Sequence, residues 1–398
     1  MKNRIFQFPA IALIVTILLT AASPTAEAIG KPIHQAPHIT GPVHTSGTDI
    51  IDAAGNKVRI LGVNSSGMER GEGNEWNAKD VSPDHHFWAT PEELGCPQSY
   101  DVTAKAGFNT VRLNISWFSL ERNKPTKDAK GKIVHDWNTK FITSLDHVVN
   151  EYTKHGVAVI LCMYQWHWSP LFRDPDYFEH GSGMPFWLYP DKKVSQKDAE
   201  EQFAFDKNPI FDGYTQQDGF LDAWKMVATH FKGNNKIIAA EIINEPPHHD
   251  GWKLKEMYER FGHAIQSINP KWAIVVDQCH KEEGLPKKPN LSNMIYSIHI
   301  HPPGWDKGKD DRPSGKESIS KELAKSRSWN VPFYINDFTK FGGKDDFEPN
   351  MSAMMRYCKQ NNINWTYFTL QPVRKTSLIK KDNKTTVDDL IKVLQAGF

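Results

Sequence analysis

The sequence of 398 residues predicts an α/β fold, a closed (β/α)8 TIM barrel, on three observations. Eight short, apolar, β-prone segments recur along the chain and alternate with helical patterns. Most of these segments are unbroken apolar runs, which is typical of parallel strands covered on both faces. Eight strand–helix units in roughly 340 residues suit the size of such a barrel.

The strands are predicted from apolar runs bounded by polar or turn-forming residues. In chain order they cover residues 58–64, 109–115, 157–164, 237–244, 272–277, 294–300, 331–337 and 363–370. An open, doubly wound sheet is the alternative, but no Gly-x-Gly-x-x-Gly motif follows the first strand. The closed barrel is therefore favoured.

The helices are predicted from apolar residues that recur with helical spacing. One such helix is predicted at residues 141–154, and others at residues 219–231, 252–268, 352–361 and 387–394. Residues 278–293 are too few and too rich in proline and lysine for a good helix. Residues 165–217 exceed a normal connection and contain many aromatic residues, so we expect a long loop over the barrel mouth after the third strand.

The amino terminus has the features of a signal peptide. Lys2 and Arg4 precede an apolar run at residues 9–22, and Ala26-Glu27-Ala28 offers the small residues that signal peptidase recognises. An uncleaved membrane anchor is the alternative, although the run is shorter than the about 20 residues of a bilayer span. We expect residues 1–28 to be a signal peptide, 29–46 an irregular lead-in and 47–398 a single barrel domain. The mature protein is expected to be secreted or periplasmic.

Charge and cysteine content exclude some classes of partner and site. The chain has 48 basic and 47 acidic residues, so no positive surface predicts nucleic-acid binding. No stable membrane partner is expected once the signal peptide is removed. The sequence has no Cys-x-x-Cys pair, which argues against a structural zinc site, and its cysteines allow three full disulfide pairings: Cys96, Cys162, Cys279 and Cys358.

Chemistry in such a barrel takes place where the strands end. Glu245 follows the fourth predicted strand and Asp337 ends the seventh. Two carboxylates with nearby aromatic residues suit glycoside hydrolysis, in which one protonates the leaving oxygen and the other attacks the sugar or activates water. Other polar or aromatic residues near strand ends are Asn64, Glu69, Arg112, Asn114, Trp166, Asn244, His299 and His301.

Several motifs, in this order, resemble glycoside hydrolase family 5, the retaining cellulase family of (β/α)8 barrels. They are Gly62-Val63-Asn64 with Gly67-Met68-Glu69, Gly107 to Leu113, Ile242 to Pro246, Tyr296 to His299, and Pro332 to Phe338. The resemblance extends from Arg59 to Pro372 and is closest to secreted bacterial endoglucanases.

The resemblance implies roles for individual residues. Glu245 would be the acid/base and Asp337 would occupy the nucleophile position, with Arg112, Asn244 and His299 positioning the nucleophile and the sugar. Glu69, Trp166 and His301 are further candidate substrate-binding residues. The implied substrate is a β-linked oligosaccharide or polysaccharide. No metal or organic cofactor is implied, because two carboxylates suffice, and we expect a monomer.

The sequence also departs from the family pattern on the nucleophile side. Asp337 stands where the family has glutamate, and His301 stands where it has tyrosine. Leu370 is the expected counterpart of a tryptophan that ends the eighth strand, while Cys162 and Tyr164 replace a common Asp and His. Asp337 is therefore a slow nucleophile, a base for an inverting reaction, or a ligand-binding remnant.

Two other classes of function stay open. The first is a carbohydrate-binding pseudoenzyme that kept the cleft and lost turnover. The second is a metal-dependent barrel hydrolase that uses His299 and His301, for which the sequence offers no further matching ligand motif.

Overall fold

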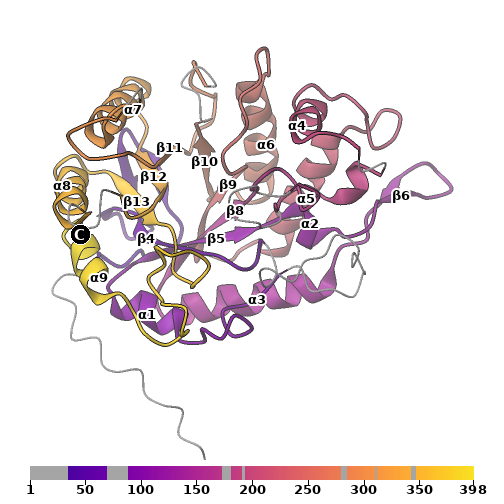
Figure 1. Cartoon of the computed structure of the whole chain (residues 1–398). Coiled ribbons are helices and arrows are strands. Elements are labelled where there is room, and N and C mark those ends of the chain that lie inside the picture. Colours follow the sequence, from indigo (N-terminus) through magenta and orange to yellow (C-terminus); the bar gives the residue numbers. More distant parts are fainter. Residues whose placement is uncertain are drawn as a thin grey trace, which may run out of the picture.

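The computed structural model describes residues 35–69, 88–172, 181–190, 193–278, 285–309, 312–341 and 347–398. Eight parallel strands form a closed barrel, and helices surround it (Figure 1). Neighbouring strands in the barrel follow one another in the sequence, and the last one pairs with the first. The predicted (β/α)8 barrel is confirmed. The predicted signal peptide, 1–28, and Cys279 lie outside the described residues.

Every predicted strand corresponds to a strand of the barrel. Nearly all of their side chains are buried, which explains why the sequence shows continuous apolar runs rather than alternation. The barrel strands are β4 (Leu61–Ser65), β5 (Thr110–Ile115), β8 (Ala158–Met163), β9 (Ile237–Glu241), β10 (Ala273–Asp277), β11 (Met294–Ile300), β12 (Phe333–Phe338) and β13 (Asn364–Tyr367).

The helices predicted from apolar spacing are all present. They are α3 (Thr139–Lys154), α5 (Gln216–His230), α6 (Leu254–Ile268), α8 (Phe347–Gln360) and α9 (Asp388–Gln395). In α3 the Asn138 side chain accepts a hydrogen bond from Phe141 N and caps the helix, whose apolar face is buried. Helices not predicted are α1 (Ser99–Lys105), α2 (Trp117–Leu120), α4 (Gln196–Ala204) and α7 (Gly315–Trp329).

A small antiparallel sheet precedes the barrel, formed by β1 (His44–Ser46), β2 (Asp49–Ile51) and β3 (Lys57–Val58). Its buried Ile50 and Val58 belong to one apolar cluster with the barrel residues Ala158 and Ala273, at the amino ends of their strands. The predicted irregular lead-in thus ends in a strand, and residues 58–64 form two short strands instead of one. A separate hairpin, β6 (Thr126–Lys127) and β7 (Ile133–Val134), follows α2.

The long connection after the third barrel strand contains the single-turn helix η1 (Phe186–Leu188) and α4. Its tryptophans hold it in place. Trp168 is buried and donates a hydrogen bond to Tyr189 OH (2.7 Å), and Trp187 donates one to Glu121 O (3.0 Å). The first bond joins two parts of the connection to each other, and the second attaches the connection to the C-cap residue of α2.

None of the helices in the described ranges has the length and apolar character needed to cross a membrane. The described cysteines are buried free thiols, at Cys96, Cys162 and Cys358.

Candidate active site

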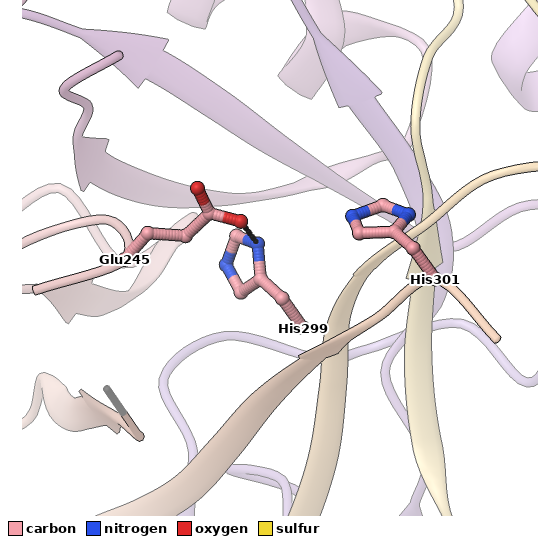
Figure 2. A group of neighbouring side chains, drawn as sticks. All are labelled: Glu245, His299 and His301. Atoms are coloured by element: carbon pink, nitrogen blue, oxygen red, sulfur yellow. Dashed lines mark ion pairs between the residues drawn. The ribbon is translucent and has the colours of Figure 1, made fainter. Parts of the chain in front are cut away.

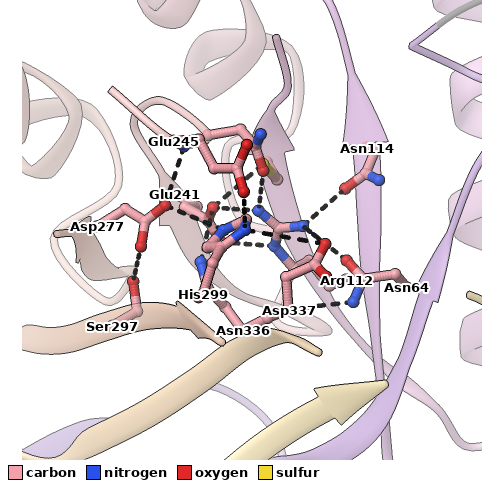
Figure 3. Close-up of polar contacts among 12 residues, drawn as sticks. Asn64, Arg112, Asn114, Glu241, Glu245, Asp277, Ser297, His299, Asn336 and Asp337 are labelled. Carbon is pink, nitrogen blue, oxygen red and sulfur yellow. Dashed lines mark hydrogen bonds and ion pairs between the residues drawn. The ribbon is translucent and has the colours of Figure 1, made fainter. Parts of the chain in front are cut away.

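The polar residues predicted at the strand ends do meet at the barrel mouth (Figure 3). Arg112 comes from β5, Glu245 from just after β9, His299 from β11 and Asp337 from β12. The side chains of all four are at most 9% exposed. Since parallel strands end at one edge of a barrel, residues far apart in the sequence share this site.

Arg112 is fully buried, and its guanidinium is held by contacts with several side chains of the site. It forms a two-pronged ion pair with Glu241, in which Nε donates to Oε2 at 2.8 Å and Nη2 contacts Oε1. Its other bonds go to Asn64 Oδ1 (2.6 Å) and Asn244 Oδ1 (2.7 Å). Nη1 also lies 3.9 Å from Asp337 Oδ2. Arg112 thereby lies between Glu241 on β9 and Asp337 on β12 and contacts the first of them directly.

Glu241 receives further hydrogen bonds from buried neighbours. Asn336 Nδ2 donates to its Oε1 at 3.0 Å, and the Cys162 thiol donates to the same oxygen at 3.3 Å. Burial raises the pKa of the Cys162 thiol well above its usual value, and the nearby Glu241 carboxylate adds to this effect, so Cys162 stays protonated. Because Asn336 precedes Asp337, Glu241 fixes the backbone beside that aspartate.

We expect the substitution Glu241→Gln to lower the free energy of unfolding by about 3–5 kcal/mol, because it leaves the buried Arg112 without its counter-charge. Urea denaturation of the wild type and the variant measures this difference. Glu151→Gln is the matched control, since it breaks an exposed pair with Lys154 and should cost about 0–1 kcal/mol. Equal losses in both variants would contradict the role given to Glu241.

Glu245 belongs to a second chain of contacts. Its Oε1 lies 2.7 Å from Nδ1 of His299, whose Nε2 lies 3.0 Å from Asp277 Oδ2. Asp277 also accepts hydrogen bonds from Glu245 N (3.0 Å) and Ser297 Oγ (3.1 Å). Burial alone would lower the pKa of His299, but Asp277 and Glu245 raise it well above its usual value. The imidazolium is therefore held between two carboxylates.

Asp337 faces the Arg112 guanidinium and two imidazoles without a close contact to any of them. Its Oδ2 lies 3.9 Å from Arg112 Nη1 and 4.0 Å from His299 Nδ1, and its Oδ1 lies 3.7 Å from His301 Nε2. Hydrogen bonds of this kind are about 2.7–3.2 Å long. Burial raises the pKa of Asp337 above its ordinary value, although these three groups oppose the effect.

The sequence model of the family described as cellulase (glycosyl hydrolase family 5) matches residues 51–373. The chain belongs to glycosyl hydrolase family 5. It is 23% identical over 382 residues to an endoglucanase of Paenibacillus polymyxa, covering 85% of this chain and 81% of that protein.

Solved structures with similar folds include an endo-glycoceramidase and an endogalactoceramidase. The endo-glycoceramidase II of Rhodococcus sp. has a TM-score of 0.63 and 19% identity, covering 87% of this chain and 80% of the other. An endogalactoceramidase has a TM-score of 0.65 and 16% identity, covering 83% and 74%. These likenesses support the barrel fold. Membership of family 5 makes the protein a glycosidase of the cellulase or endoglycosidase type.

One family 5 correspondence expected from the sequence is wrong. Leu370 does not occupy the mouth position of the family tryptophan, because it is fully buried in the large apolar core. Strand β13 ends at Tyr367, and although Leu370 N still donates a hydrogen bond to Asn64 O of β4 (3.0 Å), the Leu370 side chain lies in the core and not at the mouth. Phe368 instead forms a small cluster at the mouth with Cys162 and Tyr164.

The remaining predicted residues of this family 5 site lie around the same mouth. Trp166 packs against the Phe368 cluster, and its buried Nε1 has no hydrogen-bond partner among the described residues. His301 is at the rim, with its side chain 46% exposed. Glu69 is buried and accepts a hydrogen bond from Gly67 N (2.7 Å), which places it in the turn after β4.

Two acidic residues of the site were not predicted, and both had a signal in the sequence. Asp277 is the last residue of β10 and thus occupies a strand end, as Asp337 nearly does on β12. Glu241 is the only acidic residue in the predicted strand 237–244. Because a parallel barrel strand is buried, a carboxylate within it needs a partner of opposite charge. Both residues bind the predicted ones directly, Glu241 to Arg112 and Asp277 to His299.

Proposed function

We propose that this family 5 protein hydrolyses a β-linked glycan with retention of configuration, using Glu245 as acid/base and Asp337 as nucleophile. One observation carries the proposal. Glu245 Oε1 lies 2.7 Å and Asp337 Oδ2 lies 4.0 Å from the same atom, Nδ1 of His299. The separation of these two oxygens cannot exceed the sum of the two distances. Carboxyl groups are about 5–5.5 Å apart in retaining enzymes and about 6.5–9.5 Å apart in inverting ones, so the limit admits the retaining spacing and excludes nearly all of the inverting range.

The reaction proceeds in two displacements. Glu245 takes up the proton that it shares with His299 Nδ1 and gives it to the glycosidic oxygen, while the Asp337 carboxylate attacks the anomeric carbon. The bond between that carbon and the glycosidic oxygen breaks, and the leaving sugar departs as an alcohol. Glu245 then removes a proton from water, whose oxygen attacks the anomeric carbon and releases Asp337.

The residues around the two carboxylates position them and the sugar. Arg112 balances the charge of Asp337, and its bond to Asn244 fixes the residue that precedes Glu245. His299 holds the Glu245 carboxylate in place. Trp166 offers a ring and an unpaired N–H at the mouth, which suit stacking on a sugar and bonding to a hydroxyl group. His301 and Glu69 complete the proposed substrate-binding set.

The test is a screen of purified mature protein, residues 29–398, on glucan, mannan, xylan and a glycosphingolipid. The endoglucanase relative and the glycoceramidase structures motivate the first and last substrates. We expect new reducing ends from at least one substrate, and proton NMR should show the product anomer with retained configuration. Inverted product would contradict the role of Asp337 as nucleophile.

A carbohydrate-binding protein without turnover is the second candidate. The observation that favours it is the distance of at least 3.7 Å between the Asp337 carboxylate and each of the nearest nitrogens of Arg112, His299 and His301. Isothermal titration with oligosaccharides identifies this case, in which binding occurs without hydrolysis of any substrate in the screen.

We also propose export of the protein to the periplasm or the medium, on the basis of the signal-peptide pattern in residues 1–28. Amino-terminal sequencing of the protein recovered from the producing cells should begin at Ile29. A chain that begins at Met1 and stays in the membrane fraction would favour the anchor instead.

The pH dependence of hydrolysis should have an acid limb set by Asp337. A nucleophile must be ionised, and burial raises the pKa of Asp337 above 3.8, so activity should fall at a higher pH than for an ordinary aspartate. The imidazole of His301 lowers this pKa, and His301→Gln should therefore move the acid limb of kcat/KM to higher pH. A limb that is unmoved or shifted to lower pH would contradict the assignment.

Chelators should leave the activity intact, because the two carboxylates perform both displacements without a metal. The measurement is the rate on the best glycan before and after dialysis against EDTA. Loss of activity that zinc or manganese restores would instead support the metal-dependent hydrolase that uses His299 and His301.

A further inference from the structure

Two imidazoles and two carboxylates converge at the mouth of the barrel. Figure 2 shows Glu245, His299 and His301 facing one another, and one ligand atom from each lies within 4.8 Å of the others. Asp337 Oδ1 lies 3.7 Å from Nε2 of His301, next to this group. Three possible metal ligands thus lie close together, and Asp337 lies beside them.

The contacts behind His299 resemble those of a metal-binding histidine. Such a histidine usually gives its second ring N–H to a carboxylate, which fixes the ring and makes the first nitrogen a better ligand. Here Nε2 of His299 lies 3.0 Å from Asp277 Oδ2, and Asp277 is held by Ser297 Oγ. The other ring nitrogen, Nδ1, faces Glu245 and Asp337.

A second observation points independently to a ligand. Asp337 is 4% exposed, and its Oδ1 accepts no hydrogen bond from any described residue. A buried carboxylate oxygen without a donor is costly, and a bound cation would satisfy it. The half-exposed His301 lies between this oxygen and solvent, so it offers an entry path and can adjust its ring to the ion.

We propose that this site binds one divalent transition-metal ion, with Zn²⁺ as the best fit, through His299 Nδ1, His301, Glu245 and Asp337. The ion replaces the proton that His299 shares with Glu245, and that proton passes to solvent. Since both carboxylates needed for hydrolysis become ligands, the ion inhibits the enzyme. The inhibition rests on the proposed function, whereas the binding does not.

The ligand set determines the class of ion. Two imidazoles with two carboxylates suit zinc and its neighbours, while magnesium and calcium prefer oxygen ligands alone. Zinc places its ligands about 2.0–2.2 Å from the ion, so binding requires the Asp337 oxygens, now 3.7 and 4.0 Å from the two imidazoles, to move slightly closer to them.

The experiment is an isothermal titration of mature, tag-free protein with zinc chloride. We expect one ion per chain with wild type, and binding at least about tenfold weaker in His301→Gln. The matched control is His263→Gln, which removes an exposed imidazole bonded to Asn290 O, away from the mouth. This control should bind zinc as wild type does.

The inhibition is measured in parallel, with each protein compared with its own rate without zinc. The zinc concentration that halves the rate should rise at least about tenfold in His301→Gln and stay unchanged in His263→Gln. Absence of binding, or equal binding by wild type and His301→Gln, overturns the inference. If no glycan is hydrolysed, the titration still decides whether the site exists, and only the proposed function fails.

Discussion

Replacing Glu245 by glutamine is expected to reduce kcat on natural glycans by about 10²–10⁴-fold, because the leaving sugar then departs without a proton. Glutamine keeps the shape of the side chain, and the backbone bond from residue 245 to Asp277 does not depend on its charge. Oligosaccharide binding should therefore survive. The measurements are kcat on an unactivated glycan and the dissociation constant from titration calorimetry.

The substrate supplies the control for this substitution. An aryl glycoside with an acidic phenol leaves readily as an anion, so it needs little help from a general acid. Glu245→Gln should thus lose much less rate in the glycosylation step with this substrate than with the natural glycan. Wild-type turnover on both substrates would remove Glu245 from the mechanism, and an equal loss on both would indicate a damaged site.

The barrel could be predicted because its parallel strands are buried on both faces and leave long apolar runs in the sequence. The helix α7 shows where this logic fails. Its buried positions include the polar Glu322 and Ser326 beside Ile319 and Leu323, so the apolar spacing is too sparse to detect. Capping residues mark its ends: Ser314 accepts a hydrogen bond from Glu317 N, and Asn330 has a left-handed conformation.

The site could be predicted where a residue closely follows a strand and belongs to a recognisable motif, as Glu245 does after β9. Asp277 ends a strand without such a motif, and its function depends on a contact with His299, which no local pattern reveals. Phe368 illustrates a different limit. Which residue after β13 reaches the mouth depends on where the chain leaves the barrel edge, and the sequence does not fix that point to one residue.

Asp337→Asn should reduce turnover on every glycan below detection, because the neutral amide cannot attack the anomeric carbon. The variant should still fold, since Asp337 accepts no hydrogen bond at Oδ1 and its ion-pair distances are long. Near-normal turnover in Asp337→Asn would exclude this carboxylate as nucleophile and as base. Thermal unfolding of the variant checks that any loss is chemical.

Asp337→Glu should raise kcat, by up to about a hundredfold, because one more methylene brings the carboxylate nearer to the anomeric carbon. The Asp337 carboxylate lies 3.7 Å from the His301 imidazole and 4.0 Å from that of His299, and a longer side chain would shorten these distances. The half-exposed His301 can move to admit it, whereas Asn336 is fixed by Glu241. A lower kcat would mean that the surroundings are built for aspartate and that the extra methylene overpacks them. If wild type and both variants bind oligosaccharide but none hydrolyses it, the distances around Asp337 are those of a binding site that has lost its nucleophile.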